Sequence, residues 1–258
     1  MGRALISGLL RAGTRPEHLS VGESSRAARA ELARELGVSA SPDNAAAVAG
    51  AAIVVLAVKP QEAAGVLQPL AATLAAARPL LISVVAGVRI ASLRQWCPGV
   101  PLLRAMPNRP ALLGAGATGA YAPPQVDAAA RASAEAVLRA VGEVVWVDDE
   151  PALDVVTALS GSGPAYFFLL AELMARAGTE LGLEALSAQR LARVTLYGAG
   201  LMAQSGTADL AQLRASVSSP GGTTQAALAA LESADLGGAV ARALRAATTR
   251  SRELAAQA

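Results

Sequence analysis

The sequence contains very few of the side chains that form covalent cross-links or bind transition metals. Its 258 residues include one cysteine, Cys97, and one histidine, His18. A single cysteine excludes an internal disulfide, and a structural zinc site takes about four ligands that are mostly Cys and His. We therefore expect no metal site, and the low cysteine content is consistent with a reducing cytoplasm.

Charged residues and long apolar runs are also scarce. Charged residues make up 16% of the chain, the formal net charge is +2, and the arginines are spread rather than clustered. This pattern gives no electrostatic footprint for nucleic acid. The apolar run Ala51–Val58 ends at Lys59-Pro60, far short of the roughly 20 apolar residues that cross a bilayer. With no signal-peptide pattern at the start, we expect a cytoplasmic protein with neither nucleic acid nor membrane as a partner.

Hydrophobic residues make up 53% of the chain and follow two different patterns. In residues 1–150, short apolar runs alternate with helical stretches, which is typical of a parallel sheet covered on both faces. In residues 151–258 only helical patterns remain, and they are rich in Ala and Leu. We predict an α/β fold, with a doubly wound parallel sheet followed by an all-α domain. An apolar helical domain often buries a face against a partner subunit, so we expect an oligomer, with a compact monomeric bundle as the alternative.

The expected elements follow from these patterns. The predicted strands are Leu19–Val21, Ala51–Val58, Leu80–Ala86, Leu102–Met106, Gly116–Tyr121 and Glu143–Val147. The predicted helices are Arg26–Leu36, Gln61–Ala77, Ile90–Trp96, Val126–Val141, Pro164–Gly182, Ser187–Ser205, Asp209–Ser216, Thr223–Glu232 and Leu236–Ala256.

The chain opens in a helical pattern, Met1–Leu10, rather than in a strand. A doubly wound nucleotide domain normally opens with an apolar strand and a Gly-rich turn before its first helix. The turn after the strand Leu19–Val21 contains Glu23 followed by Ser24-Ser25-Arg26. An acidic residue at this turn favours NAD, whereas Ser or Arg accommodates the 2′-phosphate of NADP, so the turn leans modestly toward NADP. Ser24 or Ser25 also fits the N-cap of the next helix.

Two further strand ends, and one turn between helices, are candidates for ligand contact. Lys59-Pro60 follows one strand, where Pro60 also suits the first turn of a helix. Ala86-Gly87 ends another strand, where a glycine permits close approach of a ligand to the backbone. Ser160–Gly163 precedes a long helix and is interpreted as a tight bend between helices, with a ligand contact as the alternative. It is not a nucleophile elbow, because the Gly-x-Ser-x-Gly spacing is absent.

The most informative segment is Val217–Gln225, in which two glycines and several hydroxyl side chains precede a helix. The free backbone N–H groups of a helix N-terminus bind anions. No Gly-Lys-Ser/Thr follows, so the segment suits a small carboxylate better than a polyphosphate. The alternative is a Gly-rich turn between helices without a ligand.

Taken together, these segments resemble the pyrroline-5-carboxylate reductase family along nearly the whole chain. Each segment is moderately specific, and their order and spacing make the resemblance strong. The segments that carry it are Ala57–Gln61, Ser83–Val88, Arg104–Asn108, Leu159–Tyr166 and Val217–Thr224.

The resemblance implies a Rossmann domain that binds NAD(P) at residues 1–150 and a helical domain at 151–258 that dimerises and binds substrate. It implies reduction of 1-pyrroline-5-carboxylate to L-proline by a homodimer or a ring of dimers, with NADPH as cofactor and NADH as the alternative. The implied cofactor residues are Met1, Gly2, Ser24, Arg26, Asn44, Ala57, Val58, Lys59, Pro60, Val84, Val85 and Ala86. The implied substrate residues are Val217, Ser219, Gly221, Gly222, Thr223 and Thr224, and Thr224 is the catalytic candidate because it would hydrogen-bond the imine nitrogen.

The sequence departs from the family pattern at three places. Only Met1-Gly2 corresponds to the glycine motif with which the family opens, so we expect that about a dozen residues, including a first strand, precede the chain in the native protein. Arg109 stands where the family usually has threonine, and Ser218 also replaces a usual threonine. Two alternatives remain open: a hydroxyacid dehydrogenase relative, which the lack of any lysine beyond Lys59 disfavours, and a degenerate dimer without cofactor binding.

Overall fold

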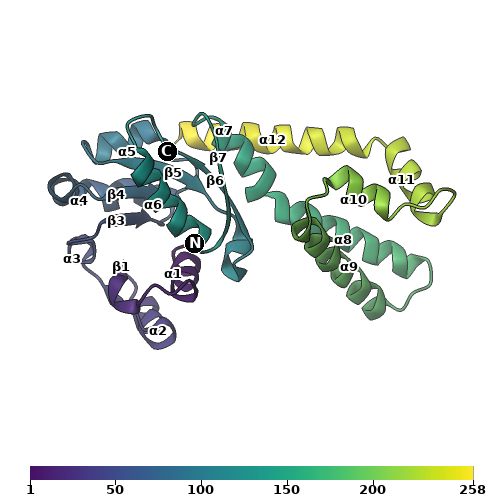
Figure 1. Ribbon diagram of the computed structural model, residues 1–258, viewed down its shortest axis with the longest axis horizontal. Helices are drawn as coiled ribbons and strands as arrows, with labels where there is room; N and C mark the ends of the chain where they lie inside the picture. The colour runs from purple at the N-terminus through teal and green to yellow at the C-terminus, as the bar shows by residue number, and fades with distance from the viewer. Residues whose placement is uncertain (258) are drawn as a thin grey trace. The chain divides into compact units, whose positions relative to one another are not determined.

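The computed structural model describes residues 1–257, which divide into two compact units. The first unit contains Met1–Ser162 together with the C-terminal residues from Ala247 onward, and the second contains Gly163–Ala246. All the strands of the described chain belong to the first unit, and the second is helical (Figure 1).

The main sheet of the first unit has five strands in the order β3-β4-β5-β6-β7. The expected parallel sheet is confirmed, with one antiparallel pairing that the sequence did not indicate, between β5 and β6. These two strands are joined by a short 3-10 helix, η3 (Arg109–Leu113), whereas a parallel connection needs a crossover of a dozen or more residues. The strands are β3 (Ile53–Leu56), β4 (Leu80–Ser83), β5 (Leu102–Met106), β6 (Gly116–Tyr121) and β7 (Gly142–Trp146).

The sheet separates two hydrophobic cores because successive side chains of a strand point to opposite faces. From β4, Leu80 and Ile82 enter one core, which also contains Leu5 of α1 (Gly2–Arg11) and Leu138 of α6 (Ala128–Arg139). Leu81 enters the other core with the buried residues of α4 (Ala63–Ala77) and α5 (Ile90–Trp96). Burial on both faces explains why these strands are continuous apolar runs in the sequence.

A second, two-stranded parallel sheet pairs β1 (Ser20–Gly22) with β2 (Ser39–Ser41). The helix between them, α2 (Arg26–Leu36), has the bounds that its sequence pattern predicts, and α3 (Asn44–Val48) follows β2. The helix α1 is tied to α2 by Arg3, which forms ion pairs with Glu31 and Glu35.

The segment predicted to be a tight bend between helices has a different structure. Helix α7 (Ala152–Val156) runs directly into a π-helical turn, η4 (Thr157–Gly161), and then into α8 (Gly163–Glu180). The interpretation of Ser160–Gly163 as a bend is therefore wrong. A π-helical turn widens the helix without ending it, and such turns occur frequently at functional sites.

The second unit contains α8, α9 (Ala185–Ser205), α10 (Leu210–Ser216), α11 (Thr223–Ser233) and the first part of α12 (Leu236–Ala256). Acidic side chains begin two of these helices. Glu184 accepts hydrogen bonds from the backbone of Leu186 and Ser187 at the start of α9. Asp209 forms a reciprocal capping box with Gln212 at the start of α10, an arrangement that satisfies two otherwise unpaired groups.

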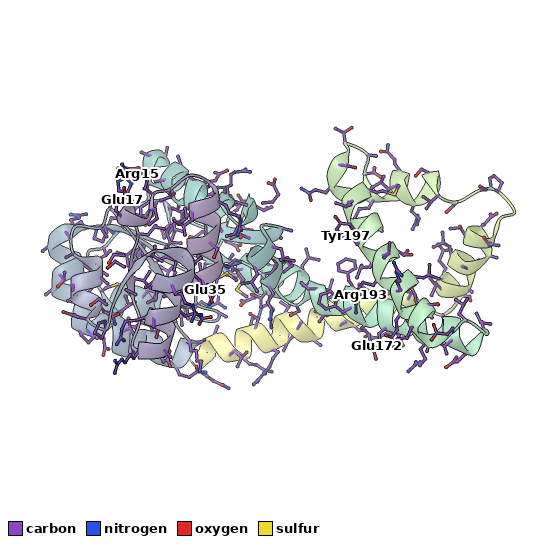
Figure 2. All side chains as sticks on the ribbon, turned by 90° about the horizontal axis from the view of Figure 1, so that it is seen from below. Arg15, Glu17, Glu35, Glu172, Arg193 and Tyr197 are labelled. Atoms are coloured by element: carbon purple, nitrogen blue, oxygen red, sulfur yellow. The ribbon has the colours of Figure 1, made fainter. Side chains whose placement is uncertain are left out.

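Helices α8 and α9 expose large apolar side chains. Phe168 and Tyr197 are 65% and 67% exposed, and Arg193 and Glu172 also carry exposed side chains on these helices (Figure 2). One helical stretch, Ala152–Glu180, is long and apolar enough to cross a membrane by length and composition alone, with a mean hydropathy of 1.3 in its most apolar window. Exposed apolar surface of this extent is typical of a protein interface.

Candidate functional site

The residues expected to bind cofactor all belong to the first unit. Most of them follow the carboxyl ends of β1, β3 and β4, whereas Met1 and Gly2 lie at the start of α1 and Asn44 at the start of α3. Ala57 follows β3 directly and lies against the start of α1, because a Cβ atom added to Gly2 would lie 3.5 Å from the Cβ of Ala57. Ligands of open α/β sheets bind beyond the carboxyl ends of the strands. The structure thus brings Met1, Gly2 and Ala57 together at the edge of the sheet where a nucleotide is expected.

Asn44 lies beside the end of β1, although it is distant from that strand in the sequence. It is the first residue of α3, and a Cβ atom added to Gly22 would meet the Asn44 side chain. Only glycine leaves room for this contact. The structure therefore groups Asn44 with the β1–α2 turn that contains Ser24 and Arg26.

The β1–α2 turn leads into a capped helix. The Ser25 hydroxyl accepts a hydrogen bond from the Ala28 N–H over 3.3 Å, which confirms one of the two predicted caps. Ser24 and Arg26 are exposed, and among the described residues neither side chain has a hydrogen-bond or ion-pair partner. Both are therefore available to a ligand.

The segments that follow β3 and β4 differ in the exposure of their side chains. Lys59 is exposed, and Pro60 begins the 3-10 helix η2 (Pro60–Glu62), as the predicted helix start requires. Val84 and Val85 are buried in the core, with 9% and 2% exposure, whereas Ala86 is exposed. A ligand at this edge would meet Val84 and Val85 through their backbone.

Two partly buried ion pairs lie in the first unit, one of them formed by Arg89, shortly after the β4 segment. Arg89 donates to Asp154 over 2.7 Å, and the Ser251 hydroxyl of α12 donates to the same carboxylate over 2.8 Å. Arg104 of β5 donates to Glu150 over 2.7 Å. The Glu150 carboxylate also accepts the backbone N–H of Ile90 over 2.8 Å. These contacts fix the chain that follows Ala86.

Sequence analysis did not single out these ion pairs. The only signal was an arginine, Arg104, within an otherwise apolar strand, and its partner is 46 residues away. Asn108, which sequence analysis named only as the end of a segment that carries the resemblance, is also buried. Its side chain donates to the Ser160 carbonyl of η4 and accepts from the Ala117 N–H of β6.

A cavity of about 320 Å³ lies at the start of α1, lined by Met1, Ala4, Arg109 and Leu112. Arg109 is exposed, and in the described part of the chain no acidic group pairs with it. The residue that departs from the family pattern therefore lies beside the first residues of α1.

The residues expected to bind substrate belong to the second unit and form the start of α11. Gly221 has a φ of 71°, a left-handed conformation that favours glycine, and its N–H donates to Gln225. Gly222 is the N-cap, and no side chain caps the helix. Ser219 accepts the Gly222 N–H, Val217 is 54% exposed, and Thr223 and Thr224 form the first helical turn. This geometry leaves the N-terminus of α11 open to an anion.

Comparison with known proteins identifies the family. A family model described as pyrroline-5-carboxylate reductase dimerisation matches residues 150–254, and one described as NADP oxidoreductase coenzyme F420-dependent matches residues 1–87. The pyrroline-5-carboxylate reductase of Pseudomonas aeruginosa is 45% identical over 258 residues, which are 100% of this chain and 94% of that protein. The chain belongs to the pyrroline-5-carboxylate reductase family.

Solved structures of the family have the same architecture. A pyrroline-5-carboxylate reductase from Coxiella burnetii matches with a TM-score of 0.95 and 38% identity, over 98% of this chain and 94% of that one. A Plasmodium falciparum pyrroline carboxylate reductase with NADP bound matches with a TM-score of 0.82 and 27% identity, over 99% of this chain and 94% of that one. The resemblance found in the sequence is thus confirmed, as is the Rossmann-like unit followed by helices.

Membership of the reductase family also bears on the alternatives and on assembly. A 45% match along the whole chain does not favour a degenerate, non-catalytic relative. The dimerisation model covers α8 and α9, whose exposed apolar side chains fit a subunit interface. The reductase is therefore a homo-oligomer. Within residues 1–257, no cluster of three or more His, Cys, Asp or Glu side chains is arranged to hold a metal ion.

Proposed function

We propose that this protein reduces 1-pyrroline-5-carboxylate to L-proline with NADPH. The observation that carries the proposal is the 45% identity to the Pseudomonas aeruginosa pyrroline-5-carboxylate reductase, over a match that covers the whole of this chain. The N-terminus of α11 has no side-chain cap, so it offers backbone N–H groups to a carboxylate.

The cofactor is assigned to the strand edge of the first unit. The relative from Plasmodium falciparum has NADP bound, and the family model that matches residues 1–87 is an NADP oxidoreductase model. The unpaired Ser24 and Arg26 suit a 2′-phosphate, and the start of α1 at Gly2 suits a diphosphate. Asn44, the Ala57–Pro60 turn and the backbone of Val84–Ala86 complete the assigned site. NADH is the alternative cofactor.

The substrate carboxylate is assigned to the turn formed by Ser219, Gly221, Gly222, Thr223 and Thr224, with Val217 beside it. The N–H groups of Gly221 and Gly222 are bonded within the turn, so the N–H groups of Thr223 and Thr224 and the hydroxyls are the donors assigned to the carboxylate. Fixing the carboxylate orients the ring, and orientation accounts for a large part of catalysis in reactions of this kind. When bound, NADPH supplies the hydride that reduces the ring imine carbon.

Thr224 is assigned the catalytic contact with the imine nitrogen. The nitrogen gains one proton and the carbon gains one hydride, so that the C=N bond becomes a C–N single bond. The Thr224 hydroxyl holds the N–H through a hydrogen bond while the proton is supplied by solvent. No side chain with a tuned pKa is needed for this step.

The proposal also covers the arrangement of the subunits and the location of the enzyme in the cell. The oligomer is built from dimers that use the apolar faces of α8 and α9, with a ring of dimers as its larger form. The enzyme acts in the cytoplasm, a location that agrees with its single, buried cysteine.

The test is NADPH oxidation that depends on added 1-pyrroline-5-carboxylate. We expect Thr224→Val to lower kcat/KM by about 10- to 100-fold, because a hydrogen bond to a charged group contributes roughly 1.5–3 kcal/mol. Ser233→Ala, at the other end of α11, is the matched control and should leave the rate unchanged. A folded wild-type protein that binds NADPH and does not oxidise it with this substrate would overturn the proposal.

A further inference from the structure

Arg29, on the first turns of α2, is bonded to the backbone of the preceding turn. Its Nη1 group donates to the Glu23 carbonyl over 2.7 Å and to the Ser24 carbonyl over 2.8 Å. The side chain is half-buried, unlike that of Arg26, which is exposed. Hydrogen bonds from a charged guanidinium are shorter and stronger than neutral ones, so this contact fixes the backbone of the turn.

The acidic side chain of the turn is also held. The Glu23 carboxylate accepts the Ser25 N–H over 2.7 Å. One carboxylate oxygen of Glu23 is therefore already hydrogen-bonded within the turn. An acidic residue at this position would favour NAD by accepting hydrogen bonds from the ribose hydroxyls. Meanwhile the two carbonyl oxygens, which would repel a phosphate, are occupied by Arg29.

The side chains of this turn that have no partner are suited to binding a phosphate. Ser24 and Arg26 project a hydroxyl and a guanidinium that have no partner among the described residues. An Arg fork matches phosphate oxygens in geometry as well as in charge. The turn thus presents donors outward while its acceptors are satisfied internally.

We propose that Arg29 is a positioning residue that sets the preference for NADPH over NADH. This inference rests on the proposed function. Arg29 does not touch the 2′-phosphate. It holds the backbone of Glu23 and Ser24 in the conformation that presents Ser24 and Arg26 to that phosphate.

The test compares two arginines of the same helix. Arg29→Met removes the hydrogen bonds to the Glu23 and Ser24 carbonyls, whereas Arg34→Met removes an exposed side chain that pairs only with Glu35. We expect Arg29→Met to raise the KM for NADPH about tenfold, equivalent to about 1.4 kcal/mol, with kcat and the KM for NADH nearly unchanged. Arg29→Lys should recover part of the preference, because its ammonium retains the charge without the planar fork. Arg34→Met should match the wild type.

Direct binding separates this inference from the proposed function. Calorimetric titration with NADP⁺ and NAD⁺ needs no substrate, so it remains informative even if 1-pyrroline-5-carboxylate is not reduced. An equal loss of affinity for both nucleotides, or no loss for NADP⁺, would overturn the role of Arg29.

A second variant covers the case in which Arg29→Met fails to fold. Glu23→Gln keeps an acceptor for the Ser25 N–H and removes the negative charge, so NADP⁺ should bind as tightly or more tightly and NAD⁺ should be unaffected. Weaker binding of NAD⁺ by Glu23→Gln would show that Glu23 contacts the ribose, and this would contradict the proposal.

Discussion

Asp154 is buried with 3% exposure and holds two partners that lie far from it in the sequence. Arg89 precedes α5 and Ser251 lies near the end of α12, 65 and 97 residues away. A carboxylate taken out of water is tolerated only when it is paired and hydrogen-bonded, and both conditions are met here. The cluster also anchors the chain that follows Val84–Ala86, the segment proposed to contact the cofactor.

Removal of this carboxylate should destabilise the first unit. We expect Asp154→Ala to lower the free energy of unfolding by about 3 kcal/mol, which is the low end of the range for breaking a buried ion pair. The low end applies because the Arg89 side chain is 26% exposed and keeps contact with water. Urea unfolding followed by circular dichroism measures the effect. Glu253→Gln, which disturbs only an exposed pair with Arg250, is the control and should change stability far less. Equal effects of the two variants would contradict the structural role of Asp154.

The sequence indicated the candidate site residues unevenly. Ser24 and Arg26 were accessible to prediction because a capped turn after a strand has a local signature. Asn44 came from family resemblance alone, and its contact with Gly22 depends on β1 and β2 lying side by side. Arg104 stood out only as an arginine in an apolar strand, and Glu150 and Asp154 gave no local signal, because the partners of these ion pairs are distant in the sequence.

Among the elements, several were predicted with their bounds, whereas α8, α9 and β3 differ from the prediction by one or two residues at their ends. The helices α2, α5 and α12 and the strands β5 and β6 begin and end at the predicted residues. By contrast, β2 has the sequence Ser-Ala-Ser and α3 has five residues, so neither carries an apolar period long enough to detect. The π-helical turn η4 was missed because a widened turn has the composition of an ordinary bend.

Helix α9 begins with a carboxylate cap whose strength depends on pH. The backbone N–H groups of Leu186 and Ser187 hold the pKa of Glu184 below its usual value of 4.5. A group with a lowered folded-state pKa stabilises the protein above its unfolded-state value, and this contribution is lost as pH falls through the folded-state pKa. The start of α9 is therefore acid-sensitive.

This dependence predicts the behaviour of Glu184→Ala. The variant should unfold at lower urea concentration than the wild type at neutral pH, and the gap between the two midpoints should narrow as pH falls below about 4.5. Glu232→Ala, on α11, is the control. A gap that stays constant down to about pH 3 would show that Glu184 does not act through its charge.

At the scale of the whole molecule, the exposed apolar side chains of α8 and α9 call for a partner. Phe167, Phe168 and Leu169 are 60%, 65% and 54% exposed on consecutive positions of α8. Solvation of so many large apolar groups costs free energy that burial against another subunit recovers. The apolar stretch Ala152–Glu180 includes these residues, and it lies within the part of the chain that the dimerisation model matches.

A charge placed in this face should weaken the oligomer. We expect Phe168→Glu to raise the dissociation constant of the dimer at least 30-fold, because loss of a buried aromatic at an interface costs about 2 kcal/mol or more. Sedimentation velocity over a range of protein concentrations would measure the shift. Leu113→Glu, at a position in the first unit that is 86% exposed, should leave the assembly intact. An unchanged mass for Phe168→Glu at low concentration would place the interface elsewhere.

The first unit is assembled from both ends of the chain, because residues from Ala247 onward pack with Met1–Ser162. During synthesis at roughly 5–20 residues per second, the ribosome needs on the order of ten seconds to add the intervening stretch. Until then Asp154 lacks its Ser251 partner, and the surface beside Gly87 lacks the last turn of α12. The packing of the nascent first unit is therefore incomplete until the end of its own translation.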